Sequence, residues 1–526
     1  MSFTSRQSLA VKLVDDLAPE LSEFHRQIWS YSESAWREYR SAKLYVDRLR
    51  AEGFEVEEGS GGMPTAFHAT WGSGGPQVAA YAEYDATPGY SQDAVAERGP
   101  QPGLHHWAPG FTDAHSALGV GALAGAIAAK RALEQTGGPG TIHLFGEPAE
   151  KVCGSKAVHA AKGYYDDLDA AISYHPYWHN TALWDITNCL YWSVVFTFEC
   201  VEEEPWGKEL FRSNSVGSHN LVRSPGALDA LSLMVTTTKY TKENMFPSTG
   251  SWTLNEAVLG ASHATADNLP PRISQLQFSW RSPLYDIQEQ IQEILVRNAR
   301  HVAAITNTKV SMRWVTRTRP GLPNHALTTA LYENLTELGP TTFGPEARAF
   351  AAQLEKAVGL EPSEAPFLPE NEVLISPQET DRSIREHLVP WQDCTGADDY
   401  TEYSWHAPTV RFFTSKPFLG QLGIDLWHWA NNAMNGYPAA IDPCWIKGGQ
   451  TIAATVLQAI DDEAMLATAK EEYERRRGAA DPRLVRPLLP ADFAAPTELP
   501  WPEYVQTARG FEWTLPTSRD YGERIA

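Results

Sequence analysis

Short apolar strand patterns alternate with a long apolar helix pattern in the first third of the sequence, and this alternation restricts the fold more than any other feature. The helix pattern is HSALGVGALAGAIAAKRALEQ, and the strand-like runs around it are TAFHATW, QVAAYAEY, GTIHLFGE and DAAISYHP. Strands that alternate with helices predict an α/β domain with a largely parallel sheet. Ligands bind beyond the carboxyl ends of such strands, so we expect the functional residues there.

The pattern changes between residues 191 and 317. Two strand and helix pairs in this segment predict a small α+β domain inserted into the larger one; they are YWSVVFTFEC with PGALDALSLMVTTTKYTKE, and QLQFSWR with YDIQEQIQEILVRNAR. We therefore expect a catalytic domain formed by residues 1–190 and 318–526. Its second part contains one long helix, GGQTIAATVLQAIDDEAMLATAKEEYERRR, and a proline-rich tail from about residue 479 that should wrap the surface.

Charge and cysteine content exclude several kinds of partner. A formal net charge of -22 repels phosphate backbones and anionic lipid, so we expect neither a nucleic-acid nor a membrane partner. The N-terminus lacks a signal-peptide pattern, and we see no run of about 18 uncharged apolar residues. Five cysteines without CxxC spacing suggest neither a disulfide framework nor a thiolate zinc site, and they favour a cytoplasmic protein.

Asp113 and His115 precede the long apolar helix in the segment TDAHSALG. Oxygen and imidazole ligands that emerge together from such a loop suit a divalent transition metal. The alternative is a structural one, in which Asp113 caps the helix and His115 is a buried, hydrogen-bonded histidine.

Other polar residues follow predicted strands. Glu147 and Glu150 lie in FGEPAEKVCGSK, where a carboxylate could act as general base. His175 follows a buried strand and precedes a proline, which is a rigid place for a ligand. His428 lies between two tryptophans and could instead be a packed aromatic-cluster histidine.

Taken in order, these segments resemble the metal-dependent peptidases and amidohydrolases that include hippurate hydrolase, auxin-conjugate hydrolases, carboxypeptidase G type enzymes and the aminobenzoyl-glutamate hydrolase B subunit. The resemblance covers nearly the whole chain, and the last branch is the most similar one. The motifs that carry it are GGMPTAFHATWG, AEYDATPGYSQ with Asp85, TDAHSALG, FGEPAEK, DAAISYHP, ALDALSLM, DNLPP, DDYTEYSWHAPTVRFF and WHWANN.

The resemblance implies an aminopeptidase-like three-layer α/β/α catalytic domain with an inserted ferredoxin-like lid, which pairs in homodimers or larger homo-oligomers. It implies metal ligands at Asp113, His115 and His175, with Asp113 in the place of the family's bridging cysteine. Lys151 stands where the family has a glutamate ligand of a second ion, and an ammonium group has no lone pair to donate. We therefore expect one zinc or manganese ion per chain, unless Glu147, Cys153 or His428 restores the second site.

The resemblance also assigns roles to polar residues. Glu150 matches the general base that acts on a metal-bound water, and His219 matches a histidine that polarises the substrate carbonyl. Asn268 and Arg281 match lid positions that hold a substrate carboxylate. Tryptophans near the motifs suggest an aromatic substrate or ordinary core packing; they are Trp178, Trp405, Trp427 and Trp429.

The expected function is hydrolysis of a C–N bond, an amide that joins an acyl or aromatic group to an amino acid. In this interpretation Lys151 acts in catalysis and His428 contacts the substrate. Two alternatives remain at this point: hydrolytic deamination of an aromatic amine on the same scaffold, and a catalytically silent homologue that binds a small carboxylate.

Overall fold

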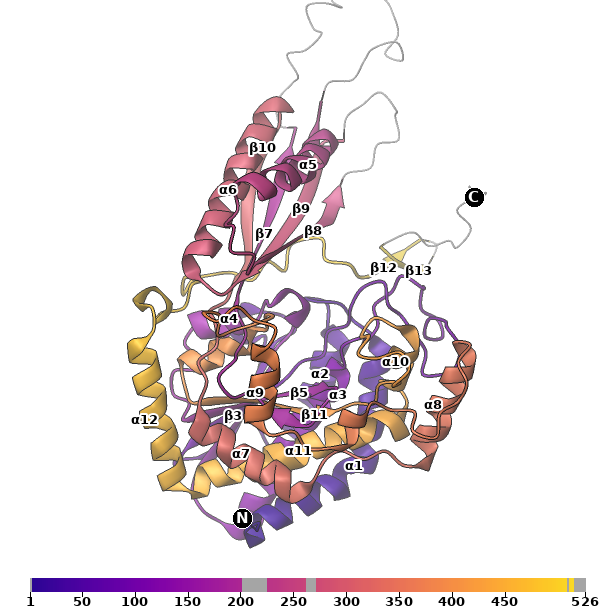
Figure 1. Ribbon diagram of the computed structural model, residues 1–526, viewed down its shortest axis with the longest axis vertical. Helices are drawn as coiled ribbons and strands as arrows, with labels where there is room; N and C mark the ends of the chain where they lie inside the picture. The colour runs from indigo at the N-terminus through magenta and orange to yellow at the C-terminus, as the bar shows by residue number, and fades with distance from the viewer. Residues whose placement is uncertain (1, 201–224, 262–270, 509, 515–526) are drawn as a thin grey trace, which may run out of the picture.

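The computed structural model describes residues 2–200, 225–261, 271–508 and 510–514. Figure 1 shows a larger body with a smaller one above it. The larger body contains a seven-stranded sheet in the order β1-β2-β4-β3-β5-β11-β6. Its four central strands are parallel and the outer ones antiparallel. The strands are β1 (Glu55–Glu58), β2 (Phe67–Ser73), β3 (Gln77–Ala82), β4 (Gly140–Gly146), β5 (Ala170–Tyr177), β6 (Thr181–Ala182) and β11 (Thr409–Ser415).

Helices cover both faces of this sheet. Successive residues of a strand point to opposite faces of the sheet. The contacts of Ser173 and Tyr174 on β5 therefore identify the elements that cover each face. The Tyr174 hydroxyl donates to the carbonyl of Cys444 in α11 at 3.2 Å. Ser173 contacts Tyr81, whose ring stacks on Tyr403 of the 3-10 helix η5. The layers are α1 (Ser5–Tyr31), α3 (His115–Thr136) and α11 (Pro438–Asp461) on one side, and α4 (Lys156–Ala161) with η5 (Asp399–Trp405) on the other.

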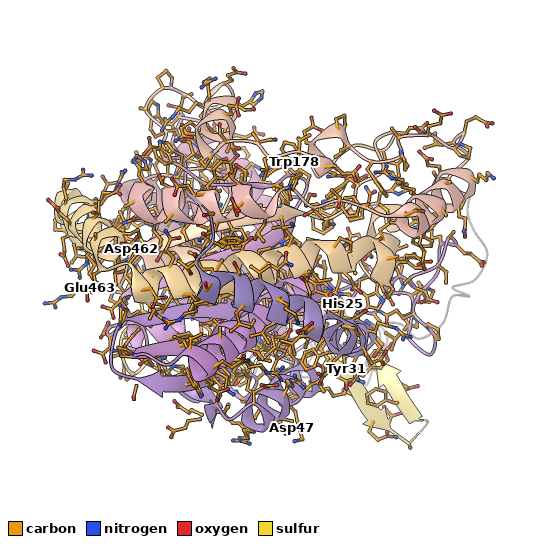
Figure 2. All side chains as sticks on the ribbon, turned by 90° about the horizontal axis from the view of Figure 1, so that it is seen from below. His25, Tyr31, Asp47, Trp178, Asp462 and Glu463 are labelled. Atoms are coloured by element: carbon orange, nitrogen blue, oxygen red, sulfur yellow. A yellow bond between two sulfur atoms is a disulfide. The ribbon has the colours of Figure 1, made fainter. Side chains whose placement is uncertain are left out.

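Small residues let the helices of the first layer approach closely. A Cβ atom at Gly125 of α3 would lie 2.6 Å from Ile452 of α11, so only glycine fits there. His25 of α1 is fully buried and contacts the Ser116 hydroxyl of α3 through its Nε2 atom at 3.0 Å. Figure 2 shows this layer from below, with His25 labelled on α1. The elements around it are α2 (Tyr39–Ala51), α7 (His325–Leu338), α8 (Pro345–Ala357), α9 (Pro377–Arg385), α10 (Trp429–Met434), α12 (Glu463–Ala479), β12 (Tyr504–Thr507) and β13 (Gly510–Trp513).

The smaller body, which we call the lid, is an antiparallel sheet in the order β10-β7-β9-β8 with two helices. Alternate residues of β7 pack against the helices in a core of their own that includes Trp192, Val194 and Phe196. The chain enters this sheet at Leu190 and leaves it at Arg317. The elements are β7 (Leu190–Glu199), α5 (Ala227–Met245), β8 (Thr253–Ala261), β9 (Ile273–Ser282), α6 (Tyr285–Ile305) and β10 (Lys309–Arg317). The predicted fold class, an α/β/α domain with an α+β lid, is confirmed.

Some details differ from the sequence-based expectation. The long C-terminal helix is two helices, because Asp462 breaks the pattern and its side chain caps α12 by accepting from the Met465 amide. The tail does more than wrap the surface, since Phe493, Leu499 and Trp501 are buried in a core shared with the lid.

Cysteine pairing also differs. Cys189 and Cys394 form a disulfide with Cα atoms 5.2 Å apart, although the cysteine spacing suggested none. The two residues are 205 positions apart, so only the fold brings them together. Cys153, Cys200 and Cys444 are free and buried.

One helix of the described residues, α3, is long and apolar enough to cross a membrane. Within it, 94% of the residues in an 18-residue apolar window are buried in the protein, as in a core helix of the catalytic domain.

Candidate functional site

Functional side chains gather at the carboxyl ends of three adjacent parallel strands. Ala82 of β3 pairs with Gly146 of β4, so the residues that follow these strands emerge side by side. Glu83 and Asp85 follow β3 and Glu150 follows β4, while β5 itself carries His175 near its end. The site therefore lies at the sheet edge that the sequence predicted.

Asp113, His115 and His175 are brought together as predicted. Asp113 Oδ1 lies 3.4 Å from His175 Nε2, and Asp113 Oδ2 lies 3.5 Å from His115 Nε2. Each oxygen of Asp113 therefore faces one of the two imidazoles. Ligand atoms within 4.8 Å of one another are found in two overlapping groups, Asp113 with His115 and Glu150, and Glu83 with His115 and His175.

Neighbouring groups orient both imidazole rings. His115 Nδ1 contacts Asp85 Oδ1 at 2.7 Å, and His175 Nδ1 donates to the Pro176 carbonyl at 2.7 Å. Burial lowers the pKa of His175 to about 3, so this ring is neutral. A neutral ring that donates from Nδ1 leaves a lone pair on Nε2, which is the form that binds a metal.

Lys151 lies inside the cluster. Its ammonium is 3.1 Å from Asp113 Oδ2, 2.8 Å from His115 Nε2 and 3.3 Å from Glu150 Oε2. Burial lowers its pKa, but the charges of Asp113 and Glu150 outweigh burial and raise the pKa above the usual value. Lys151 is therefore a cation surrounded by potential metal ligands.

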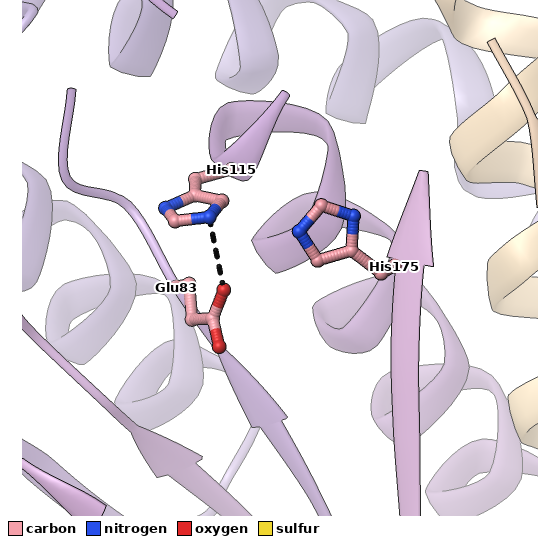
Figure 3. A group of neighbouring side chains, drawn as sticks. All are labelled: Glu83, His115 and His175. Carbon is pink, nitrogen blue, oxygen red and sulfur yellow. Dashed lines mark ion pairs between the residues drawn. The ribbon is translucent and has the colours of Figure 1, made fainter. Parts of the chain in front are cut away.

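Glu83 is a site residue that the sequence analysis missed. Its Oε2 atom lies 3.2 Å from His115 Nε2, and Figure 3 shows it with His115 and His175. The ligand atoms of these three buried residues lie within 4.8 Å of one another, so Glu83 is an alternative carboxylate ligand. The available signal was its position two residues before Asp85 in AEYDATPG, directly after a buried strand.

A second buried network joins Glu83 to the C-terminal half of the chain. Lys156 Nζ lies 2.7 Å from Glu83 Oε1 and 2.5 Å from Asp399 Oδ1, and Arg411 pairs with Asp398. Burial raises the pKa of Glu83 to about 7 and that of Asp399 well above its usual range. The charges of Glu150 and Asp398 add to the effect of burial on both pKa values, and Lys156 opposes it. In the described ion pairs of the site, carboxylates outnumber lysines and arginines two to one. The carboxylates are Glu83, Asp85, Asp113, Glu150, Asp398 and Asp399, and the basic residues are Lys151, Lys156 and Arg411.

Glu147 does not face the cluster. Its carboxylate accepts from Tyr165 at 2.6 Å and Tyr403 at 2.8 Å, and it contacts His159 at 3.0 Å. These contacts leave it no route to a second metal site. Cys153 lies closer, with a thiol that could share a cation with Glu150 and Asp399.

The side chains of Asp113 and Lys151 are 27% and 17% exposed, so small molecules can reach the cluster.

Arg281 extends from β9 of the lid, with its guanidinium 5.5 Å from the ring centre of Tyr191. Burial and the charges of Asp399 and Glu150 raise the pKa of the Cys153 thiol, and the positive charge of Arg281 opposes them. Arg281 is therefore within electrostatic range of Cys153, which lies three residues after Glu150.

His428 is not joined to the cluster. Its Nδ1 atom accepts from the Ala430 amide at 3.2 Å and so caps α10. Among the contacts of the described residues, no hydrogen bond or ion pair links His428 to Asp113 or His175. His219 and Asn268 lie outside the described residues.

The tryptophans near the motifs differ in environment. Trp405 is buried and donates to the Pro320 carbonyl, so its role is packing. Trp427 is 55% exposed and contacts Tyr90. Trp178 packs against His179, and Trp429 packs against His428.

Comparison with known proteins found similar sequences and folds. Over 470 residues the chain is 26% identical to the B subunit of p-aminobenzoyl-glutamate hydrolase from Escherichia coli (strain K12), and the match covers 85% of this chain and 91% of that protein. A protein described as an aminohydrolase from methicillin-resistant Staphylococcus aureus has a similar fold, with a TM-score of 0.52 at 12% identity over 86% of this chain and all of that one. The aminobenzoyl-glutamate utilization protein of Klebsiella pneumoniae gives a TM-score of 0.47 at 17% identity, covering 82% and 98% of the two chains. No protein-family model matches the chain.

By sequence the chain is similar to a hydrolase of the metal-dependent peptidase and amidohydrolase family, and its fold is similar to that of a solved aminohydrolase. Within that family it is similar to the aminobenzoyl-glutamate hydrolase B subunit, as the motifs indicated.

Proposed function

We propose that this chain hydrolyses the amide bond of an N-acyl or aromatic amino-acid conjugate and uses one divalent ion per chain. The observation that carries the proposal is the position of Asp113, whose two carboxylate oxygens lie 3.4 Å and 3.5 Å from the Nε2 atoms of His175 and His115. Glu150 contacts the same His115 nitrogen at 3.3 Å, so a proton acceptor adjoins the ligands.

Asp113, His115 and His175 would hold the ion, which would be zinc or manganese because both accept imidazole and carboxylate ligands. When bound, such an ion polarises a carbonyl group and lowers the pKa of water. His115 Nε2 is now 2.8 Å from the Lys151 ammonium, so Lys151 turns onto Asp113 and Glu150 when the ion binds. Glu83 is the competing carboxylate, but Lys156 already holds its other oxygen at 2.7 Å.

The remaining chemistry belongs to the side chains of the chain itself. Glu150 accepts a proton from the attacking water and returns it to the leaving nitrogen. Lys151, held 3.3 Å from Glu150, supplies a positive charge next to the developing negative charge on the substrate. It thereby replaces the electrostatic contribution of a second ion.

Substrate binding involves the lid in this proposal. Arg281 lies near the Glu150 loop and would clamp a substrate carboxylate with its planar guanidinium group. Asn268 would share that carboxylate, His219 would stabilise the oxyanion, and His428 would contact the substrate once the ligand is bound. A conjugate with an aromatic acyl group and a terminal carboxylate, as in p-aminobenzoyl-glutamate, fits these roles.

A substrate panel tests the proposal. The purified protein should release glutamate from p-aminobenzoyl-glutamate or an amino acid from another N-acyl conjugate. A chelator should abolish this activity, and zinc or manganese should restore it. Asp113→Asn should lose the ion, whereas Glu83→Gln should keep it. Metal loss in Glu83→Gln alone would assign the ligand role to Glu83 instead of Asp113.

Two other outcomes would overturn the proposed reaction. Release of ammonia from aromatic amines, without amide hydrolysis, would show a deaminase on the same scaffold. Absence of a bound ion and of turnover on both panels would show a silent homologue.

We also propose a homodimer or larger homo-oligomer. In the described lid sheet β8 is an edge strand that pairs with β9 alone, and Val258 on it is 59% exposed. Edge strands of this kind offer unpaired backbone groups to a second copy. Light scattering coupled to gel filtration measures the mass directly, and a monomer at micromolar concentration would exclude the assembly.

A further inference from the structure

A C-terminal segment lies where the lid meets the catalytic domain, and we call residues 482–503 the strap. It follows α12 and precedes the β12–β13 hairpin. Six of its apolar residues are at most 7% exposed, although the segment contains no long helix or strand; they are Leu484, Leu489, Phe493, Ala495, Leu499 and Trp501. Burial of this extent is unusual for a proline-rich tail, because such tails usually lie on the surface.

Two arginines from opposite sides hold the same short stretch of the strap. Arg313 of lid strand β10 donates to the Ala494 carbonyl at 2.6 Å and pairs with Glu498 at 2.9 Å. Arg37, in the loop between α1 and α2, donates to the carbonyls of Thr497 at 3.2 Å and Leu499 at 3.0 Å. Residues 494–499 therefore connect the two bodies by hydrogen bonds from each.

Further contacts extend the connection at both ends of the strap. Arg317 of β10 donates to the Leu488 carbonyl at 3.4 Å, and Arg483 pairs with Asp286 of α6. Pro500 approaches β8 so closely that a Cβ atom at Gly260 would lie 3.1 Å from its ring. The strap thus touches three elements of the lid.

An apolar core runs from the lid through the strap to the catalytic loop. Val195 and Val315 enter it from the lid, and Phe493 and Trp501 from the strap. Ala149, which precedes Glu150 in sequence, belongs to the same core and is fully buried. The side of the lid sheet that faces away from α5 and α6 is therefore packed, through the strap, against the support of the Glu150 loop.

We infer that the strap is a positioning element, which fixes the lid and with it Arg281 at one orientation relative to Glu150 and Lys151. Without it, the two chain crossings near Leu190 and Arg317 and the packing of α4 against β10 would connect the described parts of the two bodies, and the lid could turn about this smaller contact. A misplacement of about 1 Å can cost roughly 100-fold in rate, so a fixed lid favours the reaction. The functional part of this inference rests on the proposed role of Arg281, whereas the fixed orientation of the lid does not.

Distance measurement between spin labels tests the fixed orientation directly. Labels at Tyr240→Cys on α5 and Lys43→Cys on α2 would report it, because these side chains are exposed while Cys153, Cys200 and Cys444 are buried. The full chain should give one narrow distance distribution. A chain that ends at Ala480 and the double variant Arg37→Ala with Arg313→Ala should both give a broad one.

Kinetics tests the functional part. The double variant should raise KM for a carboxylate-bearing substrate roughly 10-fold, because the contact of Arg281 is lost while the Glu150 loop remains. A chain that ends at Glu503 is the matched control; it lacks the hairpin but keeps the strap and should behave as wild type. The arginine variant remains informative if the shortened chain does not fold.

The possible results separate the two claims. An unchanged narrow distribution in the double variant, or a broad one in the full chain, would overturn the strap as a positioning element. A broad distribution with an unchanged KM would retain the strap and refute the role of Arg281 in substrate binding.

Discussion

Lys151 Nζ lies 3.1 Å from Asp113 Oδ2, at a point that His115 and Glu150 also border. When the one proposed ion binds His115, the ammonium keeps its contacts with Asp113 and Glu150 and takes the place of a second cation. At an effective dielectric of about 20, a unit charge about 4 Å from a divalent ion costs roughly 8 kcal/mol before relaxation.

We therefore predict one tightly bound ion per wild-type chain and two in Lys151→Glu, since the new carboxylate removes the repulsion and adds a ligand. Elemental analysis after dialysis against a weak chelator measures both. Lys43→Glu, at an exposed position, is the control for the change in net charge and should keep one ion. Two ions in the wild-type chain would refute the prediction.

Glu150→Gln should reduce kcat by roughly 100-fold to 10,000-fold, because the amide cannot accept the proton of the attacking water. Metal content and thermal stability should stay near those of the wild type, since Glu150 is not among the proposed ligands. Turnover within about threefold of wild type would remove Glu150 from the mechanism. Loss of the ion would instead make Glu150 a ligand.

Arg281→Lys should raise KM for a carboxylate-bearing substrate although the charge is kept, because lysine lacks the two-pronged donor geometry. Initial-rate measurements on the substrate and on its amide derivative check this. The amide derivative, which lacks the carboxylate, should show no difference between variant and wild type. Equal KM values on the acid would exclude the clamp.

Glu147 should make the protein sensitive to acid. Burial alone raises the pKa of Glu147, but contacts with His159, Lys156 and Tyr165 outweigh it and lower the pKa to about 2, from 4.5 for the free side chain. A lowered carboxyl pKa stabilises the fold above pH 4.5, and that contribution is lost as the pH falls from about 4.5 to about 2. The difference corresponds to about 3 kcal/mol.

Urea unfolding between pH 2.5 and pH 7 measures this contribution. Glu147→Gln should be less stable than wild type at pH 7 and should lose less stability on acidification. Glu23→Gln, at an exposed position, is the control. Parallel curves for Glu147→Gln and wild type would contradict the assignment.

Three cysteines should react with a thiol reagent in the unfolded, unreduced protein, and five after reduction, because Cys189 pairs with Cys394. Cys394→Ser should lower the free energy of unfolding by about 2 to 4 kcal/mol under non-reducing conditions. Under reducing conditions the variant and wild type should differ far less. Five reactive thiols before reduction would show that the pair is not oxidised.

Local sequence patterns were enough to predict the strands and the sheet edge near which Asp113, His115, Glu150 and His175 lie; the roles of these residues as ligands and general base stay predictions. The positions follow from neighbouring residues, because apolar periodicity defines a strand and the polar residues that follow it in sequence emerge at its end. The fold class followed from the order of the same elements. The break at Asp462 escaped this reasoning, because an acidic residue inside a helical pattern can be either an exposed position or a cap.

The groups that surround those residues are set by the three-dimensional fold alone. Lys156 joins Glu83 to Asp399, and Asp399 lies 243 residues after Lys156 in the sequence. Cys189 pairs with Cys394, which lies 205 residues further along the chain. The fold also turns Glu147 away from the site and places the strap between the two bodies. Such contacts depend on the order of the strands in the sheet and on how the helices pack against them. The residues next to a side chain in the sequence therefore do not tell which distant residue will contact it.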